Sequence, residues 1–287
     1  ISGITYRSVL TPTSAQAMTI AFKVEFPGYY TNSVVYYTTD GSDPSGSFGT
    51  PTGTTNIVGG NYDSPFGNPT VDIVKATIPA QPTGTVVKYI VSAWHNGGGN
   101  EIFGNGPGNP CNSCGPITNN SSLAKIFTYT VGNVEVNATG GTATAVYPTL
   151  TAAFAAVNAG THTGTLNINI LGDTNEGTGT ALLNASGTGS ASYTTISVKP
   201  VGARTVTGAT TAGKPLIDFN GADNVTIDGL NSGGNSLTIS NTTASATSGT
   251  ATVRFIDGAT SNTITNCNIY GSASMAVGTN GGTIYFA

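Results

Sequence analysis

The sequence predicts an all-β protein with two domains, a β-sandwich followed by a parallel β-helix that begins with a short capping helix. Three observations lead to this prediction. Short runs of Val, Ile, Tyr and Phe alternate with turns rich in Gly, Asn, Asp and Pro along the 287 residues. Hydrophobic residues make up 38% and charged residues 8%, which excludes a disordered chain, and no long helix-forming run appears. A motif in the second half recurs after 37 residues.

Residues 1–131 are predicted to form the sandwich. Residues 17–26 alternate between apolar and polar positions, with Met18, Ile20, Phe22, Val24 and Phe26 on one face, as in a half-buried strand. Further strands are predicted at 3–10, 33–39, 71–78, 86–94 and 125–131. About six or seven antiparallel strands in roughly 130 residues are typical of an immunoglobulin-like sandwich.

Two segments of this domain carry a family resemblance. Residues 36–44 (YYTTDGSDP) and 76–93 (ATIPAQPTGTVVKYIVSA) resemble the chitobiase C-terminal-like and fibronectin-like accessory modules of secreted bacterial proteins. The resemblance implies a scaffold and names no ligand. Asp40 and Asp43 are the candidate calcium ligands in this turn, but a calcium cage needs about six to eight oxygens. The alternative is that Asp and Gly simply shape the turn, and we expect no metal site.

Residues 132–287 are predicted to form the β-helix. Thr149 to Asn158 is the helix candidate, because Leu150, Phe154 and Val157 fall on one face, with Thr149 as N-cap and Gly160 as C-cap. Short strands follow at 166–171, 195–198, 216–219, 225–230, 237–239, 253–256, 263–269 and 283–286. None of them is long enough to bury a core alone.

The later strands repeat. Gly221-Ala222 and Thr226-Ile227 recur as Gly258-Ala259 and Thr263-Ile264, at the same offset of 37 residues. Three strands within one period predict a coil whose rungs stack at a spacing of about 4.8 Å. Asn and Asp tolerate the left-handed backbone conformation, so Asn224, Asn262 and Asn266 are predicted at the corners between strands.

This half resembles the pectin-lyase-like right-handed β-helix. The similarity lies in residues 146–160 (VYPTLTAAFAAVNAG) and 165–178 (TLNINILGDTNEGT), which look like its helix-capped opening. It continues in residues 216–231 (LIDFNGADNVTIDGLN) and 254–271 (RFIDGATSNTITNCNIYG), which look like consecutive rungs. The competing interpretation of any single strand is a sandwich strand with chance spacing.

The sequence favours a chain without a catalytic site. The hydrolases of that family resemble one another in Asn-Thr-Asp, Asp-Asp, Gly-His-Gly and Arg-Ile-Lys boxes, none of which occurs here. The acids of the second half are expected to end turns and face water: Asp173, Glu176, Asp218, Asp223, Asp228 and Asp257. The basic groups Lys199, Arg204, Lys214 and Arg254 are interpreted as solvated or turn-bound charges, and His162 has no nucleophile motif around it. We expect neither an enzyme nor a cofactor.

Three cysteines leave the redox state open. Cys111 and Cys114 lie in a Pro- and Gly-rich loop, where outside the cell they could form a local disulfide, with two inert thiols as the alternative. A zinc site would need two further ligands, and neither His95 nor His162 has the spacing. Cys267 is predicted to be a small inward-facing core residue.

These features predict a secreted or cell-surface protein. A net charge of −4 without a basic cluster argues against nucleic acid, and no apolar run is long enough to span a membrane. The combination of domains is similar to large adhesins of the type IX secretion pathway, which implies a non-catalytic adhesive or structural role. Carbohydrate could stack on aromatic residues of the first half: Tyr29, Tyr30, Tyr62, Phe66 and Trp94.

Three alternatives stay open. The first is a carbohydrate-binding or polysaccharide-degrading β-helix, and the second is an ice-binding protein that uses outward Thr ladders. The third is a filament subunit that self-assembles through an open end of the β-helix, because unpaired strand edges invite another chain. The final strand has no closing element after it, so we expect the chain to be a piece of a longer polypeptide, truncated within the β-helix.

Overall fold

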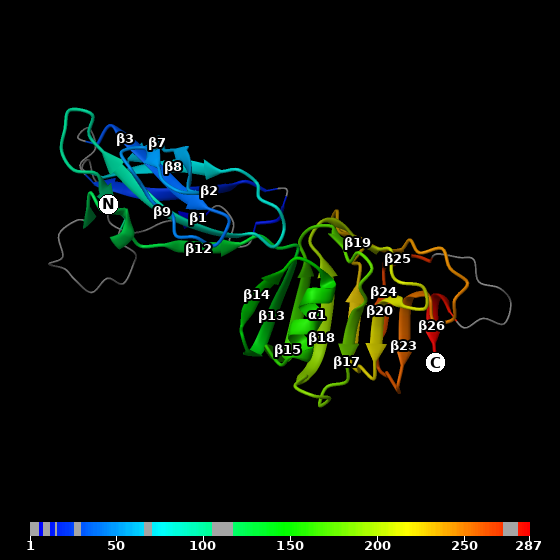
Figure 1. The fold of residues 1–287 in the computed structure, drawn as a ribbon. Helices are drawn as coiled ribbons and strands as arrows, with labels where there is room; N and C mark the ends of the chain where they lie inside the picture. Colours follow the sequence, from blue (N-terminus) through cyan, green and yellow to red (C-terminus); the bar gives the residue numbers. More distant parts are fainter. Residues whose placement is uncertain are drawn as a thin grey trace. The chain divides into compact units, whose positions relative to one another are not determined.

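The computed structural model describes residues 6–7, 12–14, 16–25, 30–65, 71–104, 117–271 and 281–287. The prediction of an all-β fold is confirmed, since almost all regular structure in the described residues is strand (Figure 1). The chain divides into two compact units, Ile1–Val131 and Gly132–Ala287. The first contains antiparallel sheets and the second a β-solenoid.

The first unit contains two larger antiparallel sheets and a small hairpin. One sheet consists, in spatial order, of β1 (Tyr6–Arg7), β2 (Met18–Glu25), β8 (Val71–Ile78) and β7 (Asn61–Pro65). The other consists of β11 (Ile117–Thr118), β10 (Ile102–Phe103), β9 (Val86–Trp94), β3 (Asn32–Thr38) and β6 (Asn56–Gly59), with β12 (Phe127–Thr130) also paired to β9. The hairpin is β4 (Gly46–Ser47) with β5 (Thr50–Pro51), and η1 (Ser121–Leu123) is a short 3₁₀ turn.

Two hydrophobic clusters hold this unit together. Met18, Ile20, Phe22 and Val24 of β2 lie in the cluster between the two sheets, as their alternation predicts. Phe26, the next residue predicted for this face, lies outside the described residues. The second cluster covers the opposite face of β3 and β9. Both faces of these strands are therefore buried, which explains their continuous apolar runs.

The second unit is a β-solenoid of about four turns, and each turn contributes one strand to each of three sheets, in which the strands of successive turns run parallel. The first sheet contains β15 (His162–Ile170), β18 (Tyr193–Pro200), β21 (Val225–Asp228) and β24 (Thr263–Thr265). The second contains β16 (Thr174–Asn175), β19 (Ala203–Gly208), β22 (Ser236–Asn241) and β25 (Cys267–Tyr270). The third contains β17 (Ala181–Asn184), β20 (Pro215–Asn220), β23 (Ala251–Ile256) and β26 (Gly282–Phe286), side by side from green to red in Figure 1.

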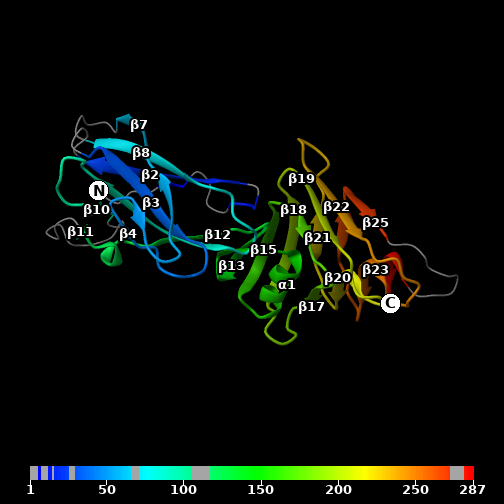
Figure 2. The same ribbon diagram turned by 45° about the horizontal axis from the view of Figure 1, so that its top comes forward.

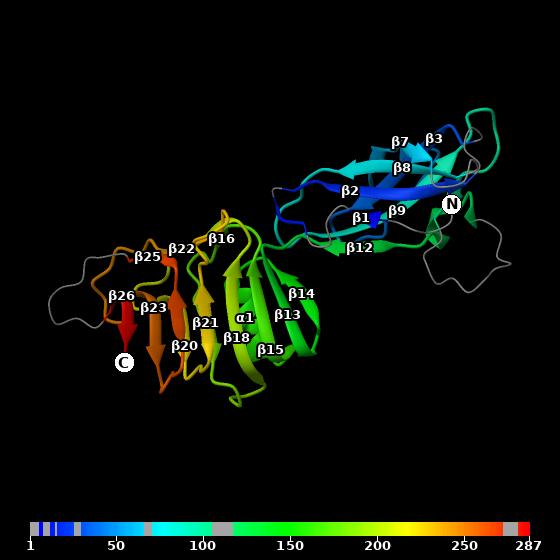
Figure 3. The same ribbon diagram turned by 180° about the vertical axis from the view of Figure 1, so that it is seen from behind.

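The predicted 37-residue repeat corresponds to the register in which strands of neighbouring turns pair. Ile227 pairs with Ile264, 37 residues later, as the sequence predicts. Other turns differ in length, since Ile196 pairs with Val225, 29 residues later. The inward side chains stack in rows, and each buried apolar side chain contributes roughly 1.5–3 kcal/mol. Figure 3 shows the first sheet from behind, with β15, β18 and β21 in sequence.

A helix and a hairpin cover the first turn. The helix α1 (Leu150–Asn158) buries Leu150, Phe154 and Val157, and the Thr149 side chain accepts a hydrogen bond from the Ala152 backbone N–H at 3.1 Å. Gly160 follows the helix with a φ of +73°, as expected beyond a helix end. The strands β13 (Val134–Gly141) and β14 (Thr144–Tyr147) pair antiparallel and extend the first sheet. Figure 2 shows α1 and β13 beside β15.

Some predicted strands are wrong in their limits. The predicted strand at 263–269 is two strands in different sheets, because Asn266 adopts the left-handed conformation (φ +55°) and turns the chain between them. Asn224 is also left-handed (φ +60°), and Asn262 bonds the backbone of the preceding turn at Val225 and Ala222, so the predicted corner positions are confirmed. The strands β17 and β19 were not predicted, since β17 (ALLN) shows no alternation of apolar and polar residues and polar residues interrupt the apolar pattern of β19 (ARTVTG).

Candidate functional site

A groove on the outer face of the third sheet of the solenoid is the candidate site. Strand β20 places Ile217 and Phe219 in the core, so Asp218 between them lies on the opposite face. Arg254 is the register partner of Asp218 on the next strand, β23. Parallel in-register pairing therefore sets these two charged side chains next to each other.

Asp218 and Arg254 form a two-pronged ion pair. Arg254 Nε donates to Asp218 Oδ1 at 2.9 Å, and Nη2 donates to Oδ2 at 2.6 Å. Asp218 is 5% exposed, so the prediction that it ends a turn and faces water is wrong. The expectation that Arg254 is a solvated or turn-bound charge is wrong as well. The hydrogen bonds to Asp218 raise the pKa of the Arg254 guanidinium above its ordinary value, so the guanidinium stays charged.

The groove beside this pair has a volume of about 380 Å³. Lys214 contributes a second cation, and the hydroxyl-bearing residues come from two loops, one before β17 and one before β20. The described residues that line it are Thr178, Thr180, Leu182, Thr211, Lys214, Asp218 and Arg254. Among them, Asp218 alone is acidic, so the lining carries two cations and one anion.

Glycines keep the loops above Arg254 close. Gly213 and Gly249 both have positive φ, at +84° and +88°, which non-glycine residues rarely adopt. A Cβ atom on Gly249 would lie 2.7 Å from the Gly213 carbonyl oxygen. The Gly213 backbone N–H donates to Thr250 Oγ1 at 2.8 Å, which joins the two loops.

This arrangement suits the binding of an anion. Both Asp218 oxygens accept hydrogen bonds from Arg254. A carboxylate held in this way is poorly placed to take a proton from, or give one to, a substrate. Inverting or retaining glycoside hydrolysis uses two carboxyl groups, and the described lining holds one. The positive groups that could attract an anionic ligand are the Lys214 ammonium and the part of the Arg254 guanidinium that does not bond to Asp218. The threonine hydroxyls can donate or accept hydrogen bonds.

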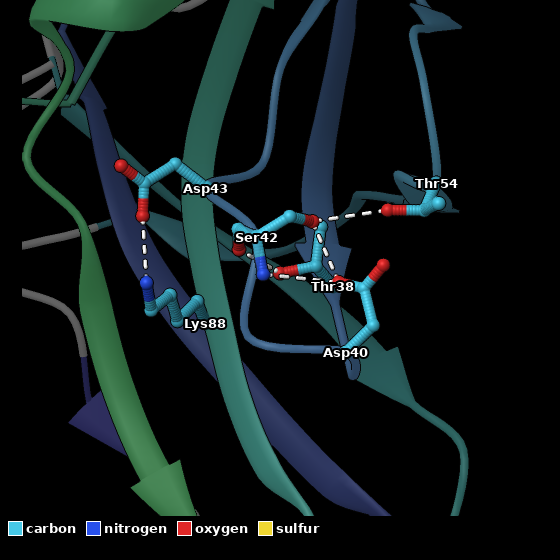
Figure 4. A network of polar contacts seen from close by, with 6 residues as sticks. All are labelled: Thr38, Asp40, Ser42, Asp43, Thr54 and Lys88. Carbon is cyan, nitrogen blue, oxygen red and sulfur yellow. Dashed lines mark hydrogen bonds and ion pairs between the residues drawn. The ribbon is translucent and has the colours of Figure 1, made fainter.

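The sandwich aspartates lie in a turn with local partners (Figure 4). Asp40 Oδ1 accepts from the Ser42 backbone N–H at 3.0 Å and from its hydroxyl at 2.6 Å. These bonds lower the pKa of Asp40 to about 2. Asp43 forms an ion pair with Lys88 at 2.8 Å. Because each carboxylate has a partner of its own, the calcium hypothesis gains no support. In the described parts of the chain, no three His, Cys, Asp or Glu side chains gather as metal ligands would.

Of the predicted aromatic residues, the structure describes Tyr30, Tyr62 and Trp94, and these three lie apart on different faces of the first unit. Tyr29 and Phe66 lie outside the described residues, as do Cys111 and Cys114. Tyr30 is half-buried and packs on the cluster between the sandwich sheets. Tyr62 is 63% exposed on β7, whereas Trp94 is half-buried on β9 in the other sheet. Trp94 has an exposed aromatic neighbour, Phe48, which the sequence analysis did not identify.

Other groups mentioned in the sequence analysis have structural partners. The prediction that Glu176 faces water is wrong, because its side chain is buried. Its two oxygens accept hydrogen bonds from the backbone N–H groups of Leu150 and Thr151 at the start of α1, at 3.1 and 2.8 Å. His162 is buried, with the Tyr147 hydroxyl 2.7 Å from Nε2 and the Thr142 carbonyl oxygen 2.6 Å from Nδ1. Cys267 is half-buried and packs against the solenoid core, as predicted.

The sequence matches no model of a known protein family and no curated protein in the comparisons made. Within the residues that the structure covers, no helix combines the length and the apolarity that crossing a membrane would require.

Proposed function

We propose that this chain is a non-catalytic extracellular surface protein, an adhesin or structural protein, whose solenoid groove binds an acidic glycan. The observation that carries the proposal is the placement of Lys214 and Arg254 in one groove with three threonine side chains. A carboxylated or sulfated sugar offers both an anion for the cations and hydroxyls for the threonines. Charged residues make up only 8% of the chain, so two cations in one groove are a local concentration of charge.

The charge of the groove favours a weak contact. Arg254 is already paired with Asp218, so the uncompensated positive charge of the lining is about one unit. One charge near the surface contributes on the order of 1 kcal/mol, which corresponds to weak binding at a single site. Adhesion would then depend on several such contacts along a polymer or among neighbouring molecules, because linked weak contacts raise the overall affinity.

The fold families of the two units are part of this proposal. We propose that the solenoid is a right-handed β-helix of the pectin-lyase-like kind and the first unit an immunoglobulin-like accessory module, as in secreted adhesins of the type IX pathway. The rows of inward apolar side chains and the capping helix support the first point, and the two antiparallel sheets support the second.

The test is a binding measurement with polygalacturonate and, as the uncharged polymer, cellulose oligosaccharides. The wild-type chain is expected to bind polygalacturonate, more weakly as salt is raised, and Lys214→Ala should lower the affinity about three- to tenfold. Lys199→Ala is the matched control, because Lys199 lies on β18, in a different sheet of the solenoid. Equal losses in both variants, or equal binding of wild type and Lys214→Ala, would contradict the groove.

The same samples test whether the protein is catalytic. Cleavage would produce new reducing ends from polygalacturonate, and eliminative cleavage would also produce an unsaturated product that absorbs ultraviolet light. We expect neither with folded protein. Product formed by the wild type and lost in Lys214→Ala would replace the binding proposal with that of a polysaccharide-degrading enzyme.

A further inference from the structure

The hairpin β4–β5 of the first unit carries an aromatic residue where its turn disfavours one. Gly46 pairs with Pro51 and Ser47 with Thr50, so Phe48 and Gly49 form a two-residue turn. Both have positive φ, +47° and +80°, as a type I′ turn requires. Asn, Asp and Gly are preferred at these positions because the left-handed conformation strains bulky side chains.

Burial does not explain the presence of Phe48. Its side chain is 43% exposed, so much of its apolar surface contacts water. The ring meets Trp94 edge to face, with centroids 6.2 Å apart and planes at 82°. Trp94 is itself half-buried and packs on the second hydrophobic cluster of the unit. The pair therefore presents apolar ring surface at the tip of the hairpin.

Hydrogen bonds to the buried side chains of Glu101 and Tyr36 hold the turn in place. The Phe48 backbone N–H donates to Glu101 Oε2 at 2.7 Å, and the Gly49 N–H donates to the Tyr36 hydroxyl oxygen at 2.8 Å. Tyr36 in turn donates to Glu101 Oε1 at 3.1 Å, and the Ser92 hydroxyl donates to the same oxygen. Glu101 and Tyr36 are fully buried, and burial raises the pKa of Tyr36, so its hydroxyl stays protonated.

Two exposed amide pairs lie close by in the sequence or register, one beside Trp94 and one beside Glu101. Asn32, the register partner of Trp94, donates to Asn96, whose backbone N–H donates to Thr31. Asn119 donates to Asn100 at 2.7 Å and accepts the Glu101 backbone N–H at 2.9 Å. Glu101, the one acidic residue in these bonds, is buried, and both of its oxygens accept hydrogen bonds.

We propose that Phe48 and Trp94, with these amides, bind a neutral sugar unit on the first unit. A sugar ring has a face of C–H groups that packs on aromatic rings, and hydroxyls that need paired donors and acceptors, which asparagine amides supply. An acidic sugar would gain no ion pair there, and an apolar protein partner would leave the amide groups unsatisfied. A strained residue held by its surroundings is a feature of ligand sites.

The turn conformation provides a test that separates binding from folding. Asn is better suited than Phe to the φ of residue 48, so Phe48→Asn should leave the melting temperature within about 2 °C of wild type or raise it. The same change should lower the affinity for a neutral sugar at least tenfold. Phe48→Gly is the second variant, because glycine also accepts this conformation.

Trp94 supplies the readout, because it is the only tryptophan of the chain. Its fluorescence is recorded in the full chain while cellohexaose, xylohexaose, mannohexaose or chitohexaose is added. At least one is expected to change the emission of the wild type, with the response lost in Phe48→Asn. Tyr62→Asn is the matched control, since Tyr62 is an exposed aromatic residue of the other sheet, and it should respond as the wild type does.

Three outcomes would overturn the proposal: no response to any of the four sugars, a response retained in Phe48→Asn, or a melting temperature lowered by more than about 5 °C in that variant. The last would show that Phe48 is a packing residue. The groove proposal is tested separately, because Lys214→Ala should leave the response to neutral sugars unchanged. Phe48→Asn should likewise leave polygalacturonate binding unchanged.

Discussion

Asp218 and Arg254 face each other on neighbouring strands of the solenoid and are joined by two hydrogen bonds of 2.9 and 2.6 Å. The side chains are 7% and 18% exposed, so the pair is screened by water less than a surface pair. Removing one partner leaves a poorly solvated charge on the other. The pair therefore contributes to the stability of the solenoid as well as to the charge of the groove.

We therefore predict that Asp218→Ala destabilises the solenoid by about 3 kcal/mol. The comparison is Asp63→Ala, which removes the exposed ion pair with Lys75 and should change the free energy of unfolding by less than about 1 kcal/mol. Urea unfolding followed by circular dichroism measures both. Similar losses in the two variants would mean that burial of the Asp218 pair has no effect on its contribution.

Glu176 is predicted to stabilise the start of the capping helix. It accepts two backbone N–H groups of the first turn of α1, and its negative charge lies at the positive end of the helix dipole. Glu176→Gln keeps an acceptor and loses the charge, so it should cost about 1 kcal/mol, and Glu176→Ala about 2 kcal/mol. Asp257→Asn, which changes an exposed acid of the solenoid, is the control for the loss of one charge. Equal stability of wild type and Glu176→Ala in urea unfolding would contradict this role.

Asp40 is predicted to make the first unit sensitive to acid. Hydrogen bonds from Ser42 and Thr54 lower its folded-state pKa from 3.8 to about 2. Since the pKa is lowered on folding, the carboxylate contributes stability above pH 3.8, and this contribution is lost as the pH falls through about 2. Asp40→Asn should therefore melt at a lower temperature than wild type at pH 5, and the difference should vanish near pH 2. A difference that stays constant over this range would exclude the mechanism.

Gly229 is predicted to be required for the close approach of two turns of the solenoid. A Cβ atom there would lie 2.1 Å from the carbonyl oxygen of Asn266, which is backbone and cannot move aside like a flexible side chain. Gly229→Ala should therefore destabilise the protein by more than about 2 kcal/mol. Gly59→Ala is the matched control, because no atom lies within 4 Å of the added methyl group. A mild effect at Gly229 in urea unfolding would mean that the turns can separate.

The sequence by itself determined the class of each half, because alternation and turn chemistry are local properties. The rows of apolar residues at alternate positions, the Thr149 cap and the alignment of Ile227 with Ile264 all follow from residues that are near in sequence or repeated. Left-handed corners at Asn224 and Asn266 follow from the preferences of asparagine itself.

Only the tertiary structure decided which polar residues meet. The turns of the solenoid differ in length, so no single period predicts that Arg254 lies against Asp218 or that Glu176 reaches α1. In the first unit, Glu101 accepts a hydrogen bond from the backbone N–H of Phe48, 53 residues away in the sequence. Nothing in the sequence around either residue predicts this contact. Apolar burial needs only a pattern, whereas a buried charge needs one particular partner, and the complete path of the chain sets that partner.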